Sequence, residues 1–329
     1  MRTEARFPGV AEGAGHYESF FVKATRPGGG QGIWLRHTVH KRPGAAPTGA
    51  IWLTLFDAGA PGPRAAKATV PASELSVPDG AYIRVGQATL APGRATGSLA
   101  LPELEASWDI AFEDAGEPFL HLPYRRLYSA PLPRTKILSP HPCARFEGTL
   151  TLGDEAIGLE GWPGMVGHNW GAEHAERWVW IQGPALHGQA ESCFDLAAGR
   201  IKLGPVRTPW VANGVLRLDG REHRLGGLDR ALATRIRERP TACEFELGGE
   251  GVRVRGRVAG EPRNFVAWIY ADPRGPEHHT LNCSIADLEL ELTREGAGAE
   301  RIELSGCAAY EIGMRETDHG IPLQPYEDG

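Results

Sequence analysis

The sequence predicts an all-β protein made of two tandem antiparallel β-barrels or sandwiches, with one short helix in the second. Glycine (43) and proline (26) together exceed a fifth of the 329 residues, a composition typical of many short strands joined by turns. Apolar and polar residues alternate at period two along most of the chain, as in strands whose two faces meet different environments. The length fits two domains of roughly 150 residues each.

Alternating segments fill the first half of the chain. In residues 32–41, Ile33 and Leu35 share one face of the expected strand, and Trp34 and Arg36 share the other. Further strands are expected at 16–24, 50–58, 66–70, 81–86, 86–91, 94–101 and 106–114. These segments are enough to close a small barrel or sandwich.

Residues 116–143 differ from the segments around them because they are rich in proline. We expect an irregular connector that crosses or covers the first domain, with one helical turn around Tyr124 to Tyr128. Long ordered loops of this kind often carry function. The expected domains are therefore residues 1–143, connector included, and residues 144–329.

Strands resume in the second half, where a hairpin is expected with its turn at residues 153–155. The expected strands cover 144–152, 156–164, 189–198, 209–220, 221–226, 241–249, 251–260, 264–273, 278–292 and 301–314. Only residues 228–240 show helical spacing, because Leu228, Leu232 and Ile236 recur every four residues. This segment is the predicted short helix.

Bulk properties exclude several classes of function. Hydrophobic residues make up 41% of the chain and charged residues 23%, and the net charge is −6 without a basic block. Nucleic-acid binding is therefore not expected. No apolar run approaches the roughly 20 residues of a membrane-spanning helix, and the first residues lack the apolar region of a secretory signal, so stable membrane insertion is not expected either.

The five cysteines are widely spaced and form no CxxC pattern. They indicate reduced thiols rather than a disulfide framework or a zinc site. A cytoplasmic protein is expected.

Aromatic and ionisable residues are most concentrated between Gly161 and Gly183. About two dozen positions hold four tryptophans, interleaved with histidine, asparagine, glutamate and arginine. Exposed tryptophans and buried charges are both costly, so this mixture points to the wall of a ligand site, where apolar surface binds and a few polar groups orient the ligand.

Within this stretch, the run Gly167-His168-Asn169-Trp170-Gly171, followed by Trp178-Val179-Trp180, resembles a known pattern. It is similar to the lipocalin-like superfamily of carotenoid 1,2-hydratases, tocopherol cyclases, fungal decalin-forming Diels–Alderases and AttH-type proteins. Weaker matches are the strand from Trp108 to Phe112, the connector and strand pair at 131–161, and a C-terminal strand near residues 308–311. The resemblance therefore covers most of the chain.

The resemblance implies two lipocalin-like barrels with a lipophilic ligand held in the first barrel or at the interface between the two. It also implies that no dissociable cofactor is used. Members of this superfamily protonate an alkene or polyene, add water to it, or fold a reactive chain so that it cyclises. Pocket shape separates these activities, so the match does not choose among them.

A general acid in a dry pocket would protonate an alkene, and histidine or a carboxylic acid can serve. The candidates are Glu173, His174, His168 and Asp109. His168 and Asn169 have an alternative role as hydrogen-bonding residues that hold a turn together. Asp109 has the alternative of facing outward if its neighbour Trp108 faces inward. A metal site is not expected, because His168 and His174 would lie roughly 20 Å apart along a strand.

Tryptophan faces can stabilise a carbocation by about 0.5–2 kcal/mol each. The candidate ligand-binding residues are Trp162, Trp170, Trp178, Trp180, Trp108 and Asn169, and barrel core is the alternative for the tryptophans. Trp178 and Trp180 are expected on one face of a strand. In the connector, Tyr124 and Arg126 are candidates for holding a polar end of the ligand.

The function predicted from these residues is a cofactor-independent isomerase, cyclase or hydro-lyase acting on a lipophilic, unsaturated small molecule. The alternative is a non-catalytic carrier of a hydrophobic metabolite. The expected partner is a hydrophobic small molecule, and both a monomer and a homodimer fit the sequence.

Overall fold

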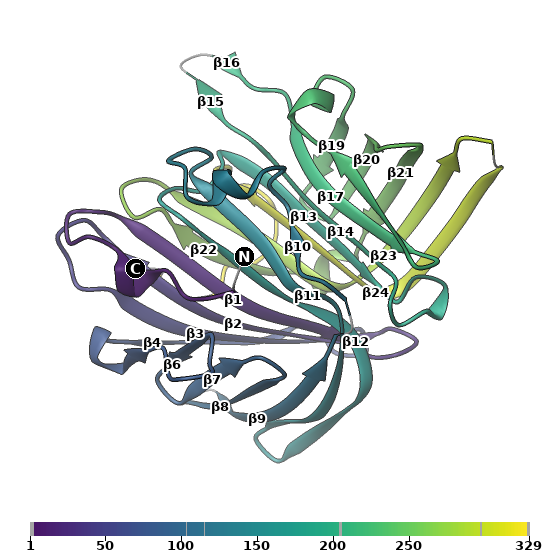
Figure 1. The fold of residues 1–329 in the computed structure, drawn as a ribbon. Coiled ribbons are helices and arrows are strands. Elements are labelled where there is room, and N and C mark those ends of the chain that lie inside the picture. The colour runs from purple at the N-terminus through teal and green to yellow at the C-terminus, as the bar shows by residue number, and fades with distance from the viewer. Residues whose placement is uncertain (1–2, 103, 115, 204–205, 297, 328–329) are drawn as a thin grey trace.

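The computed structural model describes residues 3–102, 104–114, 116–203, 206–296 and 298–327. It is all-β, as the sequence predicts. Two antiparallel sheets curl on themselves, the first into a near-barrel and the second into a half-barrel that lies against it (Figure 1).

The first sheet has 12 strands in the spatial order β4-β3-β2-β1-β12-β11-β9-β8-β7-β6-β5, and β10 pairs with β11. Its strands are β1 (His16–Thr25), β2 (Gln31–Lys41), β3 (Thr48–Asp57), β4 (Arg64–Val70), β5 (Leu75–Ser76), β6 (Ile83–Val85), β7 (Ala88–Ala91), β8 (Arg94–Leu101), β9 (Leu104–Glu113), β10 (Phe119–Leu120), β11 (Thr135–Leu152) and β12 (Glu155–Gly171).

The second sheet has 10 strands in the order β18-β17-β14-β13-β24-β23-β21-β20-β19, and β22 pairs with β23. Its strands are β13 (Arg177–Pro184), β14 (Cys193–Arg200), β17 (Val211–Leu218), β18 (Arg221–Gly226), β19 (Arg235–Arg239), β20 (Ala242–Gly248), β21 (Val252–Ala259), β22 (Val266–Ala271), β23 (Glu277–Arg294) and β24 (Ala299–Met314). Strands β15 (Lys202–Leu203) and β16 (Val206–Arg207) pair only with each other.

The described residues also include six short 3-10 turns. These are η1 (Phe7–Gly9), η2 (Ala72–Glu74), η3 (Arg125–Tyr128), η4 (Leu186–Gly188), η5 (Leu228–Arg230) and η6 (Pro262–Asn264). Turn η3 confirms the single helical turn expected in the connector. None of the helical segments in the described ranges has the length and apolar character needed to cross a bilayer.

The two sheets repeat one topology. In each, the first strand of the half pairs with the last, β1 with β12 and β13 with β24. A long hairpin closes each half, β11–β12 in the first and β23–β24 in the second, and both hairpins carry register shifts in their middle. The halves thus share an architecture that their residues do not reveal as a repeat.

The connector is shorter than expected because β11 begins at Thr135 and not at residue 144. Pro140 and Pro142 lie inside this strand, at the two register shifts between Leu138 and Ala144. A proline cannot donate to the hydrogen-bond ladder, and a bulge is where a strand tolerates it. The expected domain boundary at 143/144 falls within β11, whereas the chain leaves the first sheet after Gly171.

The predicted helix at 228–240 is wrong. The segment forms only η5 and then strand β19. Leu228 and Leu232 are exposed by 74% and 81%, and Ile236 alone is buried. Ile236 lies between Arg235 and Arg237, which is an alternation of period two that fits a strand at the edge of a sheet.

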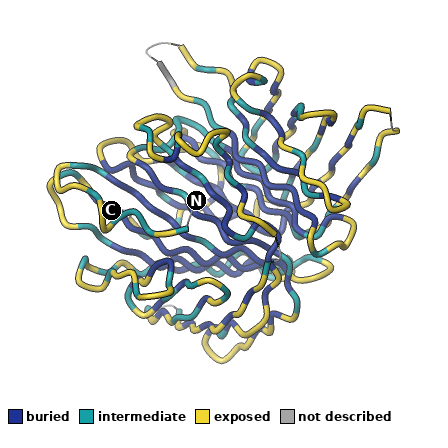
Figure 2. Tube along the Cα trace, viewed as in Figure 1, coloured by how far each residue is buried: buried dark blue, intermediate teal, exposed yellow. Residues whose placement is uncertain are grey.

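Both faces of β1, β2 and β3 are buried (Figure 2). Ile33 and Leu35 face the core inside the first sheet, as their alternation predicts. Trp34 and Trp52 point the other way, into a core shared with the second sheet. There the ring centroids of Trp52 and Trp268 lie 5.0 Å apart. The two sheets therefore pack through the outer face of the first one.

Candidate functional site

The chain crosses from the first sheet to the second through residues 172–176, between β12 and β13. We call this segment the hinge. It follows Gly171, the last residue of both β12 and the GHNWG run, whose backbone is so close to β11 that an added Cβ would clash with the carbonyl oxygen of Arg134. Only glycine allows such an approach, so the run determines where the hinge starts.

His168 is fully buried and lies inside the first sheet. Its ring is stacked between Phe20, at 3.7 Å, and Trp170, at 4.4 Å, and its Nε2 is 2.8 Å from Oε1 of Glu18. The Glu18 carboxylate also accepts hydrogen bonds from the backbone amides of residues 6 and 7. His168 thus lies within a strand and bonds to a side chain rather than to the backbone of a turn, and through Glu18 it links β12, β1 and the N-terminal segment.

The pKa shifts of Glu18 and His168 are those expected of a hydrogen-bonded pair with a structural role. Burial opposes ionisation of Glu18, but the hydrogen bonds from His16 and His168 outweigh it and hold the pKa of Glu18 at about 2. Burial lowers the pKa of His168. The carboxylate is therefore ionised and accepts a hydrogen bond from a neutral imidazole.

Three other candidates, Trp108, Asp109 and Trp162, make no contact with His168 in the described part of the chain. Trp162 and Trp108 belong to the core of the first sheet. Asp109 faces outward beside the inward-facing Trp108, as alternation predicts, and its carboxylate pairs with Arg94 at 2.6 Å with 61% of each side chain exposed. Arg94 holds the pKa of Asp109 below its usual range.

Two candidates flank the connector. Trp170 is buried against Tyr128 of the connector and Leu138 of β11. Asn169 is half-buried, and its Oδ1 atom has no hydrogen-bond partner among the described residues. The exposed Tyr124 and Arg126 contact each other, with the guanidinium 4.9 Å from the ring.

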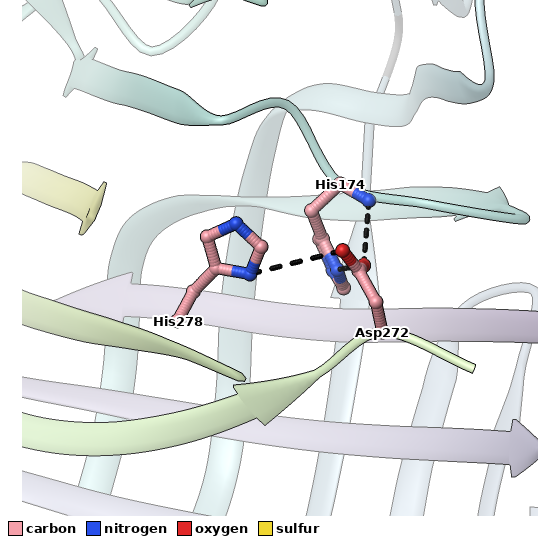
Figure 3. A group of neighbouring side chains, drawn as sticks. All are labelled: His174, Asp272 and His278. Atoms are coloured by element: carbon pink, nitrogen blue, oxygen red, sulfur yellow. Dashed lines mark hydrogen bonds and ion pairs between the residues drawn. The ribbon is translucent and has the colours of Figure 1, made fainter. Parts of the chain in front are cut away.

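The neighbouring hinge residues Glu173 and His174 have different surroundings. The carboxylate of Glu173 forms an ion pair with Arg134 near the surface. His174 instead turns toward the second sheet, where its backbone amide and its ring Nδ1 both lie 2.7 Å from Oδ1 of Asp272 (Figure 3). Asp272 follows the last residue of β22.

Aromatic rings hold the His174 imidazole on both sides. Tyr17 of β1 stacks on it with ring centroids 3.9 Å apart and an interplanar angle of 16°. Trp178 of β13 stacks at 5.2 Å and 22°. The His174 side chain is 11% exposed, and we find no hydrogen-bond partner for its Nε2 among the described residues. The ring is thus held by both sheets while one nitrogen stays available.

The second sheet supplies the rest of the site. Trp178 donates from Nε1 to Oε1 of Glu311 on β24 at 3.0 Å. Asn282 of β23 donates to the other carboxylate oxygen of Glu311 at 3.2 Å. Tyr270 and His278 lie 6.2 and 5.2 Å from the Trp178 ring. We refer to His174, Asp272, His278, Tyr17, Trp178 and Tyr270 as the hinge site.

The electrostatics of this site favour an acid–base dyad. Burial raises the pKa of the Asp272 carboxyl, but its hydrogen bonds from His174 outweigh that effect, and the net pKa is lowered. An ionised Asp272 that accepts from Nδ1–H leaves the lone pair of the neutral ring on Nε2. The same carboxylate stabilises the ring when Nε2 takes up a proton. The dyad can therefore accept a proton from a neighbouring molecule and return it.

Trp178 and Trp180 share one face of β13, as their spacing predicts, but they have different partners. Trp178 stacks in the hinge site. Trp180 is buried against Phe21 of β1, and its Nε1 donates to Oδ1 of Asp195 at 3.1 Å. Trp178 therefore lines the hinge site, whereas Trp180 belongs to a small buried cluster between the sheets.

A second buried polar cluster joins the two sheets at Asp195. The Ser139 hydroxyl donates to its Oδ2 at 2.6 Å, and Nε2 of His121 lies 3.2 Å from the same oxygen. A serine nucleophile needs its hydroxyl to donate to an imidazole that serves as base. Here the hydroxyl donates to the carboxylate, and the imidazole Nε2, which lies 3.1 Å from the hydroxyl, faces the same carboxylate oxygen. The cluster therefore links the two sheets.

A cavity of about 250 Å³ lies at strands β19, β20 and β21, far along the chain from the hinge. It is lined by Arg237, Arg239, Ala242, Cys243, Glu244 and Arg257. A lining with three arginines differs from the mainly apolar walls typical of sites for lipophilic ligands. The hinge site remains the better candidate for the predicted chemistry.

The sequence missed Asp272, His278, Tyr17 and Tyr270. The His278-His279 pair stands out in the sequence as two adjacent histidines before a strand, yet nothing in it assigns a role. Asp272 lies 98 positions from His174, and the two come together because β24 and β23 lie between β13 and β22 in the second sheet. A signal was present in the Ala271-Asp272-Pro273 run, because a polar residue directly after a buried strand often faces a site.

No family model matches the chain. Two curated sequences of Mycobacterium tuberculosis, the uncharacterized proteins Rv0493c of strain H37Rv and MT0513 of strain CDC 1551, are each 25% identical over 314 residues. Each match covers 95% of this chain and 91% of the relative.

Among solved structures, a protein of Nitrosomonas europaea provisionally named AttH matches with a TM-score of 0.53 and 14% identity, over 94% of this chain and 96% of that one. Kievitone hydratase of Nectria haematococca matches with a TM-score of 0.48 and 11% identity, over 92% and 89%. At this identity the first match concerns the fold alone. The chain has the two-sheet, lipocalin-like fold of the AttH-type structure.

Proposed function

We propose that this protein is a hydro-lyase or isomerase that moves a proton on a lipophilic, unsaturated small molecule, with the His174–Asp272 dyad as its acid–base group. The observation that carries the proposal is the His174 imidazole, oriented by Asp272 and stacked between Tyr17 and Trp178 where the two sheets meet. The resemblance of the GHNWG and WVW runs to the hydratase and cyclase superfamily supports the same class.

In the proposed reaction, protonated His174 gives its Nε2 proton to one carbon of an alkene, and the cation forms at the other carbon. Water then adds to that carbon and returns a proton to Nε2, so the net change is the addition of one water. Isomerisation follows if a neighbouring C–H proton is returned instead. Asp272 keeps the ring oriented and stabilises the imidazolium throughout.

The aromatic rings of the hinge site have two roles in this proposal. Their faces bind the apolar part of the ligand, and each can stabilise a developing cation by about 0.5–2 kcal/mol. Tyr17 comes from β1 and Trp178 from β13, so the ligand would be held by both sheets. This placement corresponds to the interface pocket that the resemblance implies.

The experiment starts from the ligand that the protein retains. Mass spectrometry of an organic extract identifies co-purified molecules, which are then incubated with fresh protein and analysed again. His174→Ala and Asp272→Asn should lower turnover at least 100-fold, within the roughly 10²–10⁴-fold that general acid–base catalysis contributes. His223→Ala, on strand β18 away from the hinge, is the matched control and should retain turnover.

A ligand recovered unchanged from the wild-type protein would favour the alternative function, a non-catalytic carrier. If both hinge variants keep full turnover, the dyad is not the acid. Glu173→Gln tests the other candidate from the sequence. We expect it to retain most of the activity because Glu173 pairs with Arg134 rather than facing the aromatic rings.

A further inference from the structure

Three ligand-type side chains converge at the hinge site. His174 comes from the hinge, Asp272 follows β22, and His278 lies near the start of β23. One donor atom from each lies within 4.8 Å of the others. Figure 3 shows dashed lines from both histidines to the Asp272 carboxylate.

The burial of His278 is not offset by a direct hydrogen bond within the described part of the chain. Its side chain is fully buried, and neither Nδ1 nor Nε2 makes a hydrogen bond to a described residue. The Oδ2 atom of Asp272 is also buried without a hydrogen bond. A buried polar atom left unsatisfied costs about 1–3 kcal/mol, so a group between these atoms would remove a substantial cost.

The separation of these atoms fits a metal ion better than a direct hydrogen bond. Nδ1 of His278 is 3.9 Å from Oδ2 of Asp272, beyond hydrogen-bond range. In a tetrahedral site, an ion with bonds of about 2.0–2.2 Å to nitrogen and oxygen ligands places two of its ligands about 3.4 Å apart, so a shift of about 0.5 Å would bring these two atoms to that separation.

We propose that His174, Asp272 and His278 form a binding site for one divalent transition-metal ion, of which zinc is the representative. Two imidazoles and one carboxylate suit zinc, iron, nickel or copper, whereas magnesium and calcium prefer oxygen ligands. Three protein ligands leave a position for water or a ligand atom.

The surrounding charge also favours a cation. The ligand set contains one carboxylate, that of Asp272. A second carboxylate nearby, that of Glu311, accepts hydrogen bonds from Trp178 and Asn282. Arg315, the residue that follows β24, is positively charged, and its electrostatic effect at His278 opposes a further positive charge there. The carboxylate in the ligand set itself provides the compensating charge.

The metal site does not rest on the proposed function. In the metal-bound form, Nδ1 of His174 would bind the ion and its proton would move to Nε2. The ion and the Nδ1–H hydrogen bond to Asp272 therefore exclude each other. A zinc ion would replace the dyad by a metal-bound water, and its presence is measurable without any substrate.

The test uses the full chain after dialysis against a chelator. Cobalt(II) is titrated into it and followed by visible absorption, and zinc binding is followed by calorimetry and elemental analysis. We expect one ion per chain. Asp272→Asn and His278→Ala should each weaken binding by more than the roughly 10–100-fold typical of losing a supporting contact to a ligand.

His279→Ala is the matched control. His279 is the adjacent residue, it bonds to His319 at 2.9 Å, and it is outside the proposed ligand set, so its loss should leave the affinity unchanged. Circular dichroism establishes that each variant is folded. X-ray absorption of the cobalt-loaded wild-type chain provides a readout that needs no variant, and it should show two imidazole ligands.

Absence of saturable binding to the wild-type chain would overturn the proposal. Binding that both ligand variants leave unchanged would overturn it as well. Neither result bears on turnover, so failure of the metal site and failure of the proposed acid–base chemistry are separate outcomes.

Discussion

Three ionisable side chains on strands β1 and β2 are buried, and they differ in how far hydrogen bonds offset the cost of burial. Glu18 is ionised and surrounded by hydrogen-bond donors. Lys23 donates to Oε1 of Gln182 at 3.0 Å and to the carbonyl of Cys307 at 2.7 Å, and burial lowers its pKa to about 7. His37 is fully buried with no hydrogen bond from either ring nitrogen to a described residue. Its cost of burial is thus uncompensated.

His37 should make the protein sensitive to acid. Burial lowers its pKa to about 4, against about 6.5 in the unfolded chain. Between these values the unfolded state binds more protons, so the stability present above pH 6.5 is lost as the pH falls toward 4. At about 1.36 kcal/mol per unit, this amounts to roughly 3 kcal/mol.

His37→Leu removes this pH-dependent contribution to stability, because the new side chain lies between Phe20 and Ile51 of the core and takes up no proton. Urea unfolding of both proteins at pH 7, 5.5 and 4 measures the difference. The variant should lose less stability than the wild type over this range. Equal losses would show that His37 does not titrate on unfolding.

At the scale of elements, the contacts between sheets come from side chains that the strands place on their outer faces. Asp195 of β14 is bonded to Ser139 of β11. Cys143 of β11 and Cys193 of β14 lie with their sulfur atoms 2.6 Å apart, both buried. All five cysteines are free thiols, as expected, but Cys143 and Cys193 are in contact with each other. Strands β11 and β14 therefore hold the sheets together at two points.

The cysteine pair should close into a disulfide under a mild, small oxidant such as diamide. Two thiols are oxidised and lose their protons, and the azo bond of diamide is reduced to a hydrazine. The contact with Cys143 and the burial both raise the pKa of Cys193, so the reaction should be slow at neutral pH. The product closes a loop of 50 residues and should add about 2–4 kcal/mol of stability.

Thiol counting and a peptide map under non-reducing conditions measure this change. The count should fall from five to three, with residues 143 and 193 in one cross-linked fragment and a higher melting temperature. Cys193→Ser should abolish the cross-link, and Cys243→Ser should leave it intact. A cross-link between other cysteines, or none, would contradict the packing of β11 on β14.

Most elements could be predicted because alternation depends only on nearby residues. The failures have physical causes. Residues 228–240 contain leucines at helical spacing, but Leu228 and Leu232 are exposed and pack on nothing that would stabilise a helix. Pro140 and Pro142 of β11 suggest a loop, because the bulges that accommodate them are defined only by the pairing with β12. The contact between His174 and Asp272 depends on the order β13-β24-β23-β22 in the second sheet, which no local pattern contains.

At the scale of the whole molecule, the hinge is where the two sheets and the candidate chemistry meet. The first sheet contributes Tyr17, the second contributes Asp272, Trp178 and His278, and the segment between them contributes His174. Around it, Trp52 and Trp268 fill the shared core. Motion of one sheet relative to the other would therefore change the distance between the two rings that hold His174.

The most direct measurement is the mass of the ligand recovered after incubation with the protein in D₂O. Proton transfer by the dyad would place one carbon-bound deuterium in the product of the wild-type protein and none with Asp272→Asn. An unlabelled ligand from the wild type, or equal labelling by the variant, would contradict acid–base catalysis at the hinge.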